Sequence, residues 1–274
     1  MKKIIFAFLT VQIFVFSCIM GISSGQDADS FKKLIRDKTK PNKERIRGLH
    51  DLMQIDSGSA LIELNSLLFS NEEIELRRLG VTYLSLYDSN RIEDILIKLF
   101  DDTDAIVRRE AVIVSGTLRM EKAYPKLIKL LLDESSLVRY ASIMALGNIG
   151  KAEALPHLVD FLNKTDSVAK LTAIPTIELI LCSSSDENDF KRTMDSLIDR
   201  LSDDNPSVRI HACNALNAIF ENQSDCTELD SSEQLELILK LKAELWSKGY
   251  KIKSCTPELI EYDDSIKKMQ LFHK

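Results

Sequence analysis

The histidines and cysteines of this chain are the residues that could support catalysis or hold a metal ion. The four histidines are His50, His157, His211 and His273, and none of them lies next to a glutamate or starts an HExxH motif. The sequence also lacks a glycine-rich phosphate-binding loop. Because metal and phosphate chemistry need their groups at fixed spacings, the sequence predicts a non-catalytic protein with no cofactor and no metal ion.

Disulfide formation is the chemistry expected of the cysteines, since no two of them have a metal-like spacing. Cys226 and Cys255 flank the last predicted helix in polar segments, and they are the predicted disulfide; reduced thiols are the alternative. Cys213 falls in the middle of a predicted helix, where we expect it to pack as a small apolar side chain. The remaining cysteines are Cys18 and Cys182.

The first 25 residues have the pattern of an export signal, with a basic start and an apolar stretch over Ile4–Phe16. Signal peptidase could cut after Gly25, which gives a signal peptide over 1–25. Alternatively "VFSC" acts as a lipoprotein box, so that a signal over 1–17 is removed and Cys18 is lipidated. An uncleaved anchor is a third alternative. The sequence therefore predicts an exported protein, either periplasmic or held at the membrane by a lipid.

The charge of the chain argues against nucleic acid as a partner. The formal net charge is −6, and removal of the leader, which carries Lys2 and Lys3 and no acid, makes it −8. A nucleic-acid backbone attracts clustered Lys and Arg. With 45% apolar and 28% charged residues, the chain is expected to fold. Contact with a membrane is expected only through the possible lipid anchor at Cys18.

A pair resembling Val-Arg recurs along the chain with a nearly constant spacing. A second apolar pattern follows each of these pairs except the last, and a period of this length is typical of stacked helix pairs. The sequence therefore predicts an all-α protein, a right-handed α-solenoid of about six antiparallel helix pairs over 26–249, with 250–274 as a C-terminal cap or tail. The pairs are Ile46-Arg47, Leu76-Arg77, Val107-Arg108, Val138-Arg139, Val168-Ala169 and Val208-Arg209.

Small residues on the predicted helix over 138–149 favour close helix packing. Val138, Ala141 and Ala145 fall on one face at helical spacing. The two apolar stripes of one helix pair cannot be buried within that pair alone, and stacked neighbours can bury them.

The fifth repeat departs from this pattern. In the alignment above Ala169 replaces the arginine, and Asn163 stands where other repeats have an aspartate. Pro175 is expected to kink or break its helix, because proline has no N–H for the helical hydrogen bond. The departure predicts either a change of curvature with a projecting binding loop, or sequence drift in a tolerant repeat.

The segment "DESSLVRYASIMALGNIGKAEALPHLVDFL" resembles the HEAT-repeat family, in its short PBS-lyase-type form, and the resemblance extends over about 41–245. It implies a structural ladder in which an aspartate before the second helix and an arginine in its first turn bond along the stack. Arginine suits this role because its fork of donors can span two repeats. The matching residues are Asp102, Arg108, Asp133, Arg139, Asp203 and Arg209.

The resemblance also places the Val-Arg helices on the inner, concave side of the stack. The residues after the ladder position then form a partner-binding stripe of Arg78, Arg109, Tyr140 and Lys170. Three bases predict an acidic protein partner. The expected function is an exported, non-catalytic scaffold that binds proteins through this surface. The alternative is a helical accessory subunit or lyase-like protein that binds a small ligand or pigment.

Overall fold

Helices account for the regular structure in the part of the chain that the computed structural model describes. These residues are 27–70, 72–164, 167–181, 184, 186–220, 226, 236–237, 239–240 and 243. They form twelve α-helices, three short 3-10 helices and no strand, so the all-α prediction is confirmed. The predicted export signal with Cys18, the C-terminal cap over 250–274 and Cys255 lie outside the described residues.

The chain divides into two compact units, 1–76 and 77–274. In the first unit, acidic side chains begin two of the helices: Asp27 accepts from the Ser30 N–H and Asp56 accepts from the Ser59 N–H. Such caps satisfy backbone donors that have no partner within the helix. Helix α3 packs against both α2 and α4. The bounds are α2 Ala28–Arg36, α3 Asn42–Ile55 and α4 Ser57–Leu68, and α5 Ile74–Leu84 spans the division between the units.

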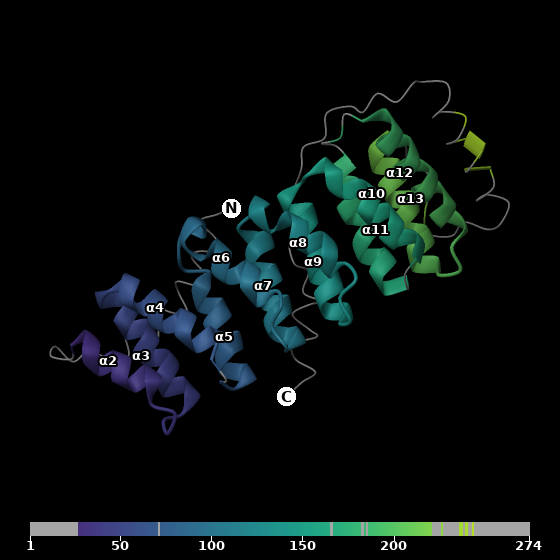
Figure 1. The fold of residues 1–274 in the computed structure, drawn as a ribbon. Coiled ribbons are helices and arrows are strands. Elements are labelled where there is room, and N and C mark those ends of the chain that lie inside the picture. The colour runs from purple at the N-terminus through teal and green to yellow at the C-terminus, as the bar shows by residue number, and fades with distance from the viewer. Residues whose placement is uncertain are drawn as a thin grey trace. The chain divides into compact units, whose positions relative to one another are not determined.

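Consecutive helices of the second unit pack in pairs, α6 with α7, α8 with α9, α10 with α11 and α12 with α13 (Figure 1). Helices α7, α9, α11 and α13 also pack on one another in order and form one layer. The remaining bounds are α6 Ser89–Leu99, α7 Ala105–Thr117, α8 Tyr124–Leu130, α9 Ser136–Ile149, α10 Leu155–Lys164, α11 Ser167–Leu181, α12 Glu187–Asp199 and α13 Pro206–Phe220.

The close packing expected of small residues occurs between α7 and α9. A Cβ atom added to Gly116 would lie 2.7 Å from both Cα and Cβ of Ala145. Atoms at that distance repel each other, so the two helix backbones can approach this closely only because position 116 has no side chain.

Two sequence predictions are corrected by the fold. Helix α11 continues through Pro175, so the predicted break does not occur. Pro175 is exposed, and its missing N–H removes one backbone hydrogen bond from the helix. Cys226 forms a disulfide with Cys213 and not with Cys255, because the Cα atoms of Cys213 and Cys226 are 5.8 Å apart, within the range that a disulfide spans. Cys213 is therefore more than a small packing residue.

Candidate functional site

A basic residue occupies the fourth position of every helix that begins a Val-Arg repeat. The position is counted from the first residue of each helix. From Arg77 to Lys170 it recurs every 31 residues. The alignment predicted from the sequence is therefore wrong in two repeats: Arg45, and not Arg47, holds the position in α3, and Lys170 holds it in α11. The ladder bases are Arg45, Arg77, Arg108, Arg139, Lys170 and Arg209.

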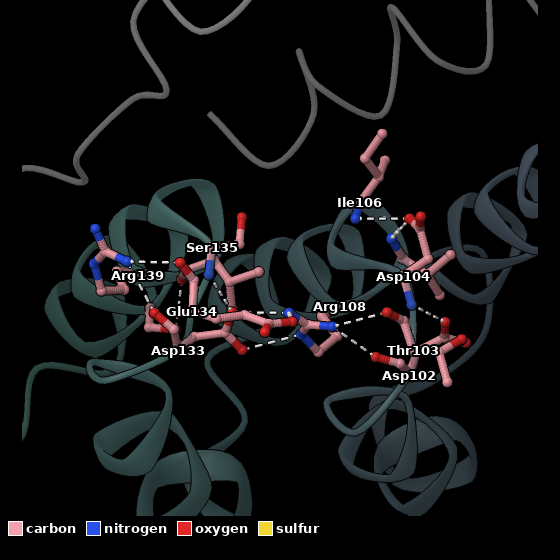
Figure 2. A network of polar contacts seen from close by, with 12 residues as sticks. Asp102, Thr103, Asp104, Ile106, Arg108, Asp133, Glu134, Ser135 and Arg139 are labelled. Atoms are coloured by element: carbon pink, nitrogen blue, oxygen red, sulfur yellow. Dashed lines mark hydrogen bonds and ion pairs between the residues drawn. The ribbon is translucent and has the colours of Figure 1, made fainter.

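Arg108 shows the full arrangement of a ladder base (Figure 2). Its Nη1 donates to the carbonyl oxygens of Asp102, at 2.8 Å, and Thr103, at 3.3 Å. Its Nε and Nη2 donate to the carboxylate of Asp133 at 3.0 and 2.9 Å. The side chains of Arg108 and Asp133 are each only 8% exposed. Arg108 therefore joins the loop before its own helix to the loop before the next helix.

The acids of the ladder also order their own loops. Asp102 Oδ1 accepts from the Asp104 N–H at 2.8 Å, and Asp133 Oδ1 accepts from the Ser135 N–H at 2.8 Å. A carboxylate that accepts an N–H two residues later stabilises a turn. Each acid thus holds the turn that starts its helix while it binds the base of the preceding repeat.

Three more ladder bases, Arg45, Arg77 and Lys170, contact a carboxylate, although with different geometry. Arg45 donates to both oxygens of Glu72 at 2.9 Å, which lowers the pKa of that glutamate. Arg77 Nη2 lies 3.1 Å from Asp102 Oδ1.

The third of these contacts is the 2.7 Å hydrogen bond from Lys170 to Asp203. Burial acts to raise the pKa of Asp203, but the hydrogen bonds from Lys170 and from the Asn205 N–H hold it below its usual value. A lysine thus takes the place of the ladder arginine in the fifth repeat.

Arg139 lacks this carboxylate contact. Its Nη1 donates to the carbonyl oxygens of Asp133, at 2.9 Å, and Glu134, at 3.1 Å, as Arg108 does in its own loop. No described residue provides a carboxylate for its Nε and Nη2. In Figure 2 the contacts of Arg108 extend to both sides, whereas those of Arg139 extend only to its own loop. Position 164, which corresponds to Asp133 by the 31-residue spacing, is a lysine.

The predicted stripe of exposed bases is wrong. Lys170 is a ladder base, and its side chain is only 16% exposed. It was assigned to the stripe because the predicted alignment of the fifth repeat is shifted by one residue. Arg109 pairs with Glu110, and its side chain is 13% exposed. Arg78 and Tyr140 are half-buried and make contacts of their own. These four residues therefore do not form a row of free charges.

An apolar surface lies where the basic stripe was predicted. The second, fifth and ninth residues of a helix share one face, and in α7, α9 and α11 these positions are mostly apolar. Val168 is 54% and Ile106 37% exposed and Pro175 is exposed, the other apolar residues are half-buried, and Met144, the ninth residue of α9, is buried. We call this surface the apolar face; its residues are Ile106, Ile113, Leu137, Tyr140, Val168, Leu171 and Pro175.

The helices on either side of the apolar face are more polar at the same positions. Helix α5 has Glu75, Arg78 and Thr82 there, and α13 has Ser207, Ile210 and Asn214. Apart from the half-buried Ile210, the apolar residues at these positions thus come from three consecutive helices. The sequence contained a signal for this surface, namely an apolar residue at 106, 137 and 168, but this spacing of 31 residues becomes visible only once the correct register is known.

The described residues contain no group of three or more His, Cys, Asp or Glu side chains that could hold a metal ion. None of the described helices is both long enough and apolar enough to cross a membrane.

Comparison with known proteins supports the repeat architecture. A family model of HEAT repeats matches residues 92–178, and a model of a single HEAT repeat matches residues 194–223. No curated protein matches the chain.

Among solved structures, the chain is similar to a designed armadillo repeat protein in complex with the peptide (KR)4, at 22% identity and a TM-score of 0.50, over 70% of this chain and 99% of the other. It is also similar to computationally designed armadillo repeat proteins for modular peptide recognition, at 22% identity, a TM-score of 0.49 and the same coverage of 70% and 99%. The complex of CpcE and CpcF of phycocyanin lyase from Nostoc sp. PCC7120 has 17% identity and a TM-score of 0.44, over 82% of this chain and 98% of the other. Residues 92–178 and 194–223 therefore match HEAT repeats, and the chain has the fold of a solenoid of stacked helices.

Proposed function

We propose that this protein is a non-catalytic scaffold that binds a peptide segment of another protein on the apolar face. The single observation that carries this proposal is the exposure of Ile106 and Val168, with half-buried apolar residues between them, on consecutive helices of one layer. Contiguous exposed apolar surface is uncommon on soluble proteins and marks interaction sites. Tyr140 lies within this surface, and aromatic residues are enriched at protein interfaces.

A peptide fits the apolar face better than a compact ligand does. Equivalent side chains such as Ile106, Leu137 and Val168 come from three helices in succession, so they offer a row of similar contacts. A row of this kind can contact successive side chains along one peptide. The designed armadillo repeat protein with the same type of fold holds the peptide (KR)4, which supports this mode of binding.

Export to an oxidising compartment is part of the proposal. The pattern of residues 1–25 supports it, and so does the disulfide between Cys213 and Cys226, since disulfides persist mainly outside the cytosol. Lipidation of Cys18 would hold the scaffold at a membrane. Mass spectrometry of the N-terminal peptide from the native host tests this: a diacylglyceryl Cys18 supports the anchor, and a free N-terminus at residue 26 contradicts it.

The peptide-binding proposal can be tested with a phage-displayed library of random 12-residue peptides selected on the purified chain. The affinity of the best peptide is then measured by fluorescence polarisation for the triple variant Ile106→Ser, Leu137→Ser and Val168→Ser. We expect a loss of affinity of at least about 10-fold, because each change removes apolar contact area.

The control for this experiment is a triple variant in which three exposed apolar residues outside the apolar face are changed, namely Ile62→Ser, Phe69→Ser and Leu132→Ser. Circular dichroism shows whether both variants remain folded. Equal affinity of the two variants, or the absence of any selected peptide, would contradict peptide binding at the apolar face. Visible absorbance in the purified chain would instead favour the alternative of a bound pigment.

A further inference from the structure

The ladder is interrupted at a single junction among the described helices α7, α9, α11 and α13. At the α7–α9 junction Arg108 binds Asp133, and at the α11–α13 junction Lys170 binds Asp203. At the α9–α11 junction the corresponding base is Arg139, and no described residue supplies its carboxylate. We call the place that this carboxylate would occupy the open ladder position.

The local charges favour an anion at the open ladder position. The residue that would supply the acid by register is Lys164, so a base replaces an acid there. Lys170, six residues later, already binds Asp203. Glu134 is the nearest acid in the chain before Arg139, but its carboxylate contacts Arg108 at 3.2 Å. Arg139 therefore retains a positive charge that the described residues do not neutralise.

The guanidinium of Arg139 is already oriented for a carboxylate. Its Nη1 is fixed by the carbonyl oxygens of Asp133 and Glu134 at 2.9 and 3.1 Å. The same two contacts in Arg108 direct Nε and Nη2 toward a carboxylate, which they bind at 3.0 and 2.9 Å. A guanidinium held in this way binds a carboxylate with two parallel hydrogen bonds and loses little side-chain freedom in doing so.

We propose that Arg139 binds a carboxylate of the partner, the side chain of an aspartate or glutamate in a peptide that lies on the apolar face. This inference rests on the proposed function and adds the chemistry of the partner to it. Arg139 is in the first turn of α9 and directly precedes Tyr140 of the apolar face. In this proposal an acidic residue of the peptide reaches Arg139 at the edge of the apolar face, next to the peptide residues that contact that face.

The first experiment asks whether the open ladder position is vacant, and it needs no partner. Lys164→Asp supplies the missing acid, and Lys164→Gln removes the same base without supplying one. We expect Lys164→Asp to have an unfolding equilibrium constant about 10-fold smaller than that of Lys164→Gln, because a charged hydrogen-bonded pair forms. The difference should vanish when both are combined with Arg139→Gln. Denaturant unfolding of the full chain measures all four variants.

Two results would overturn the vacancy. One is equal stability of Lys164→Asp and Lys164→Gln. The other is a large loss of stability in Asp166→Asn that Arg139→Gln abolishes, since this would mean that Asp166, which lies outside the described residues, already neutralises Arg139.

The second experiment tests carboxylate binding without a peptide. The probe is sodium acetate, with sodium chloride at the same ionic strength as the control, and the readout is the 15Nε resonance of Arg139 in arginine-labelled protein. We expect a saturable shift with acetate only, absent in Lys164→Asp, and no shift of Arg108. The absence of an acetate-specific shift at Arg139, or an equal shift at Arg108, would overturn the site.

The third experiment uses the best library peptide that contains an acidic residue and its form with every Asp and Glu replaced by Asn and Gln. Wild type should bind the acidic form about 10-fold more tightly. Arg139→Gln and Lys164→Asp should lose this preference and still bind the amide form as wild type does. A preference that survives in Arg139→Gln overturns the inference. If no peptide binds wild type, the proposed function fails, and the acetate titration alone decides whether Arg139 is a carboxylate site.

Discussion

The junction between α7 and α9 and the junction between α9 and α11 are built from the same 31-residue repeat, but their ladders differ. At the first, Arg108 binds two carbonyl oxygens of its own loop and the carboxylate of Asp133. At the second, Arg139 keeps the two carbonyl contacts and has no carboxylate among the described residues. The comparison shows that a ladder arginine has two separable roles, ordering its own loop and joining two repeats.

Arg108→Gln should have the largest effect and would break the first junction. It leaves the carboxylate of Asp133, 8% exposed, without its main partner, and removal of one partner from a buried pair is strongly destabilising. We expect a loss of about 3 kcal/mol in the free energy of unfolding, measured by urea denaturation. A loss no larger than that of Arg139→Gln would mean that the bridge to Asp133 contributes little.

Gly116→Ala should have the second largest effect. The new Cβ would lie 2.7 Å from the backbone of Ala145, so α7 and α9 must move apart, at a cost of about 2 kcal/mol. Gly58→Ala is the matched control, because a Cβ there meets only the Asp56 side chain, at 3.3 Å, and alanine favours the helix. Thermal unfolding of both variants measures the difference, and similar melting temperatures would contradict the close contact.

Arg139→Gln sharpens the comparison, since it removes only the role that both arginines share. The variant loses the two hydrogen bonds to the carbonyl oxygens of Asp133 and Glu134 and leaves no described carboxylate unpaired. We expect a loss of about 1 kcal/mol, one third of that for Arg108→Gln. A loss of the same size as for Arg108→Gln, in urea denaturation under the same conditions, would show that Arg139 has a carboxylate partner within the chain.

Glu178→Gln should have the smallest effect, and it should be stabilising. The same helix position holds Gly116 in α7, Gly147 in α9 and Glu178 in α11. Burial raises the pKa of the Glu178 carboxyl, so the folded state takes up its proton at a higher pH than the unfolded state does. The ionised group therefore lowers stability at pH 7, and glutamine should raise it by less than about 0.5 kcal/mol.

The pH dependence checks the cause of this change. As the pH falls through the raised pKa, wild type becomes protonated at Glu178 and gains stability relative to its value at pH 7, so the difference between wild type and Glu178→Gln should shrink. A difference that stays constant from pH 7 to pH 4 would mean that burial of the charge is not the reason.

The sequence predicted the all-α fold because the repeat period and the helical spacing of apolar residues are local properties. The resemblance to HEAT repeats placed Arg108 and Asp133 on the ladder. The alignment of the repeats failed in the fifth one, where Val168 and Ala169 are both apolar and either could be the buried member of the pair. The structure buries Ala169 and exposes Val168, and this one-residue shift moved Lys170 from the predicted binding stripe to the ladder.

The sequence by itself determined the helix pairs and their period, because these follow from local spacing, and its resemblance to HEAT repeats identified ladder residues such as Arg108 and Asp133. Only the tertiary structure decided which of two adjacent apolar residues is buried, which acid each ladder base binds and which cysteine pairs with Cys226. Each of these depends on distances between residues of different segments, such as the 5.8 Å between the Cα atoms of Cys213 and Cys226. The apolar face is of the same kind, since its row of side chains exists only when α7, α9 and α11 are stacked in register.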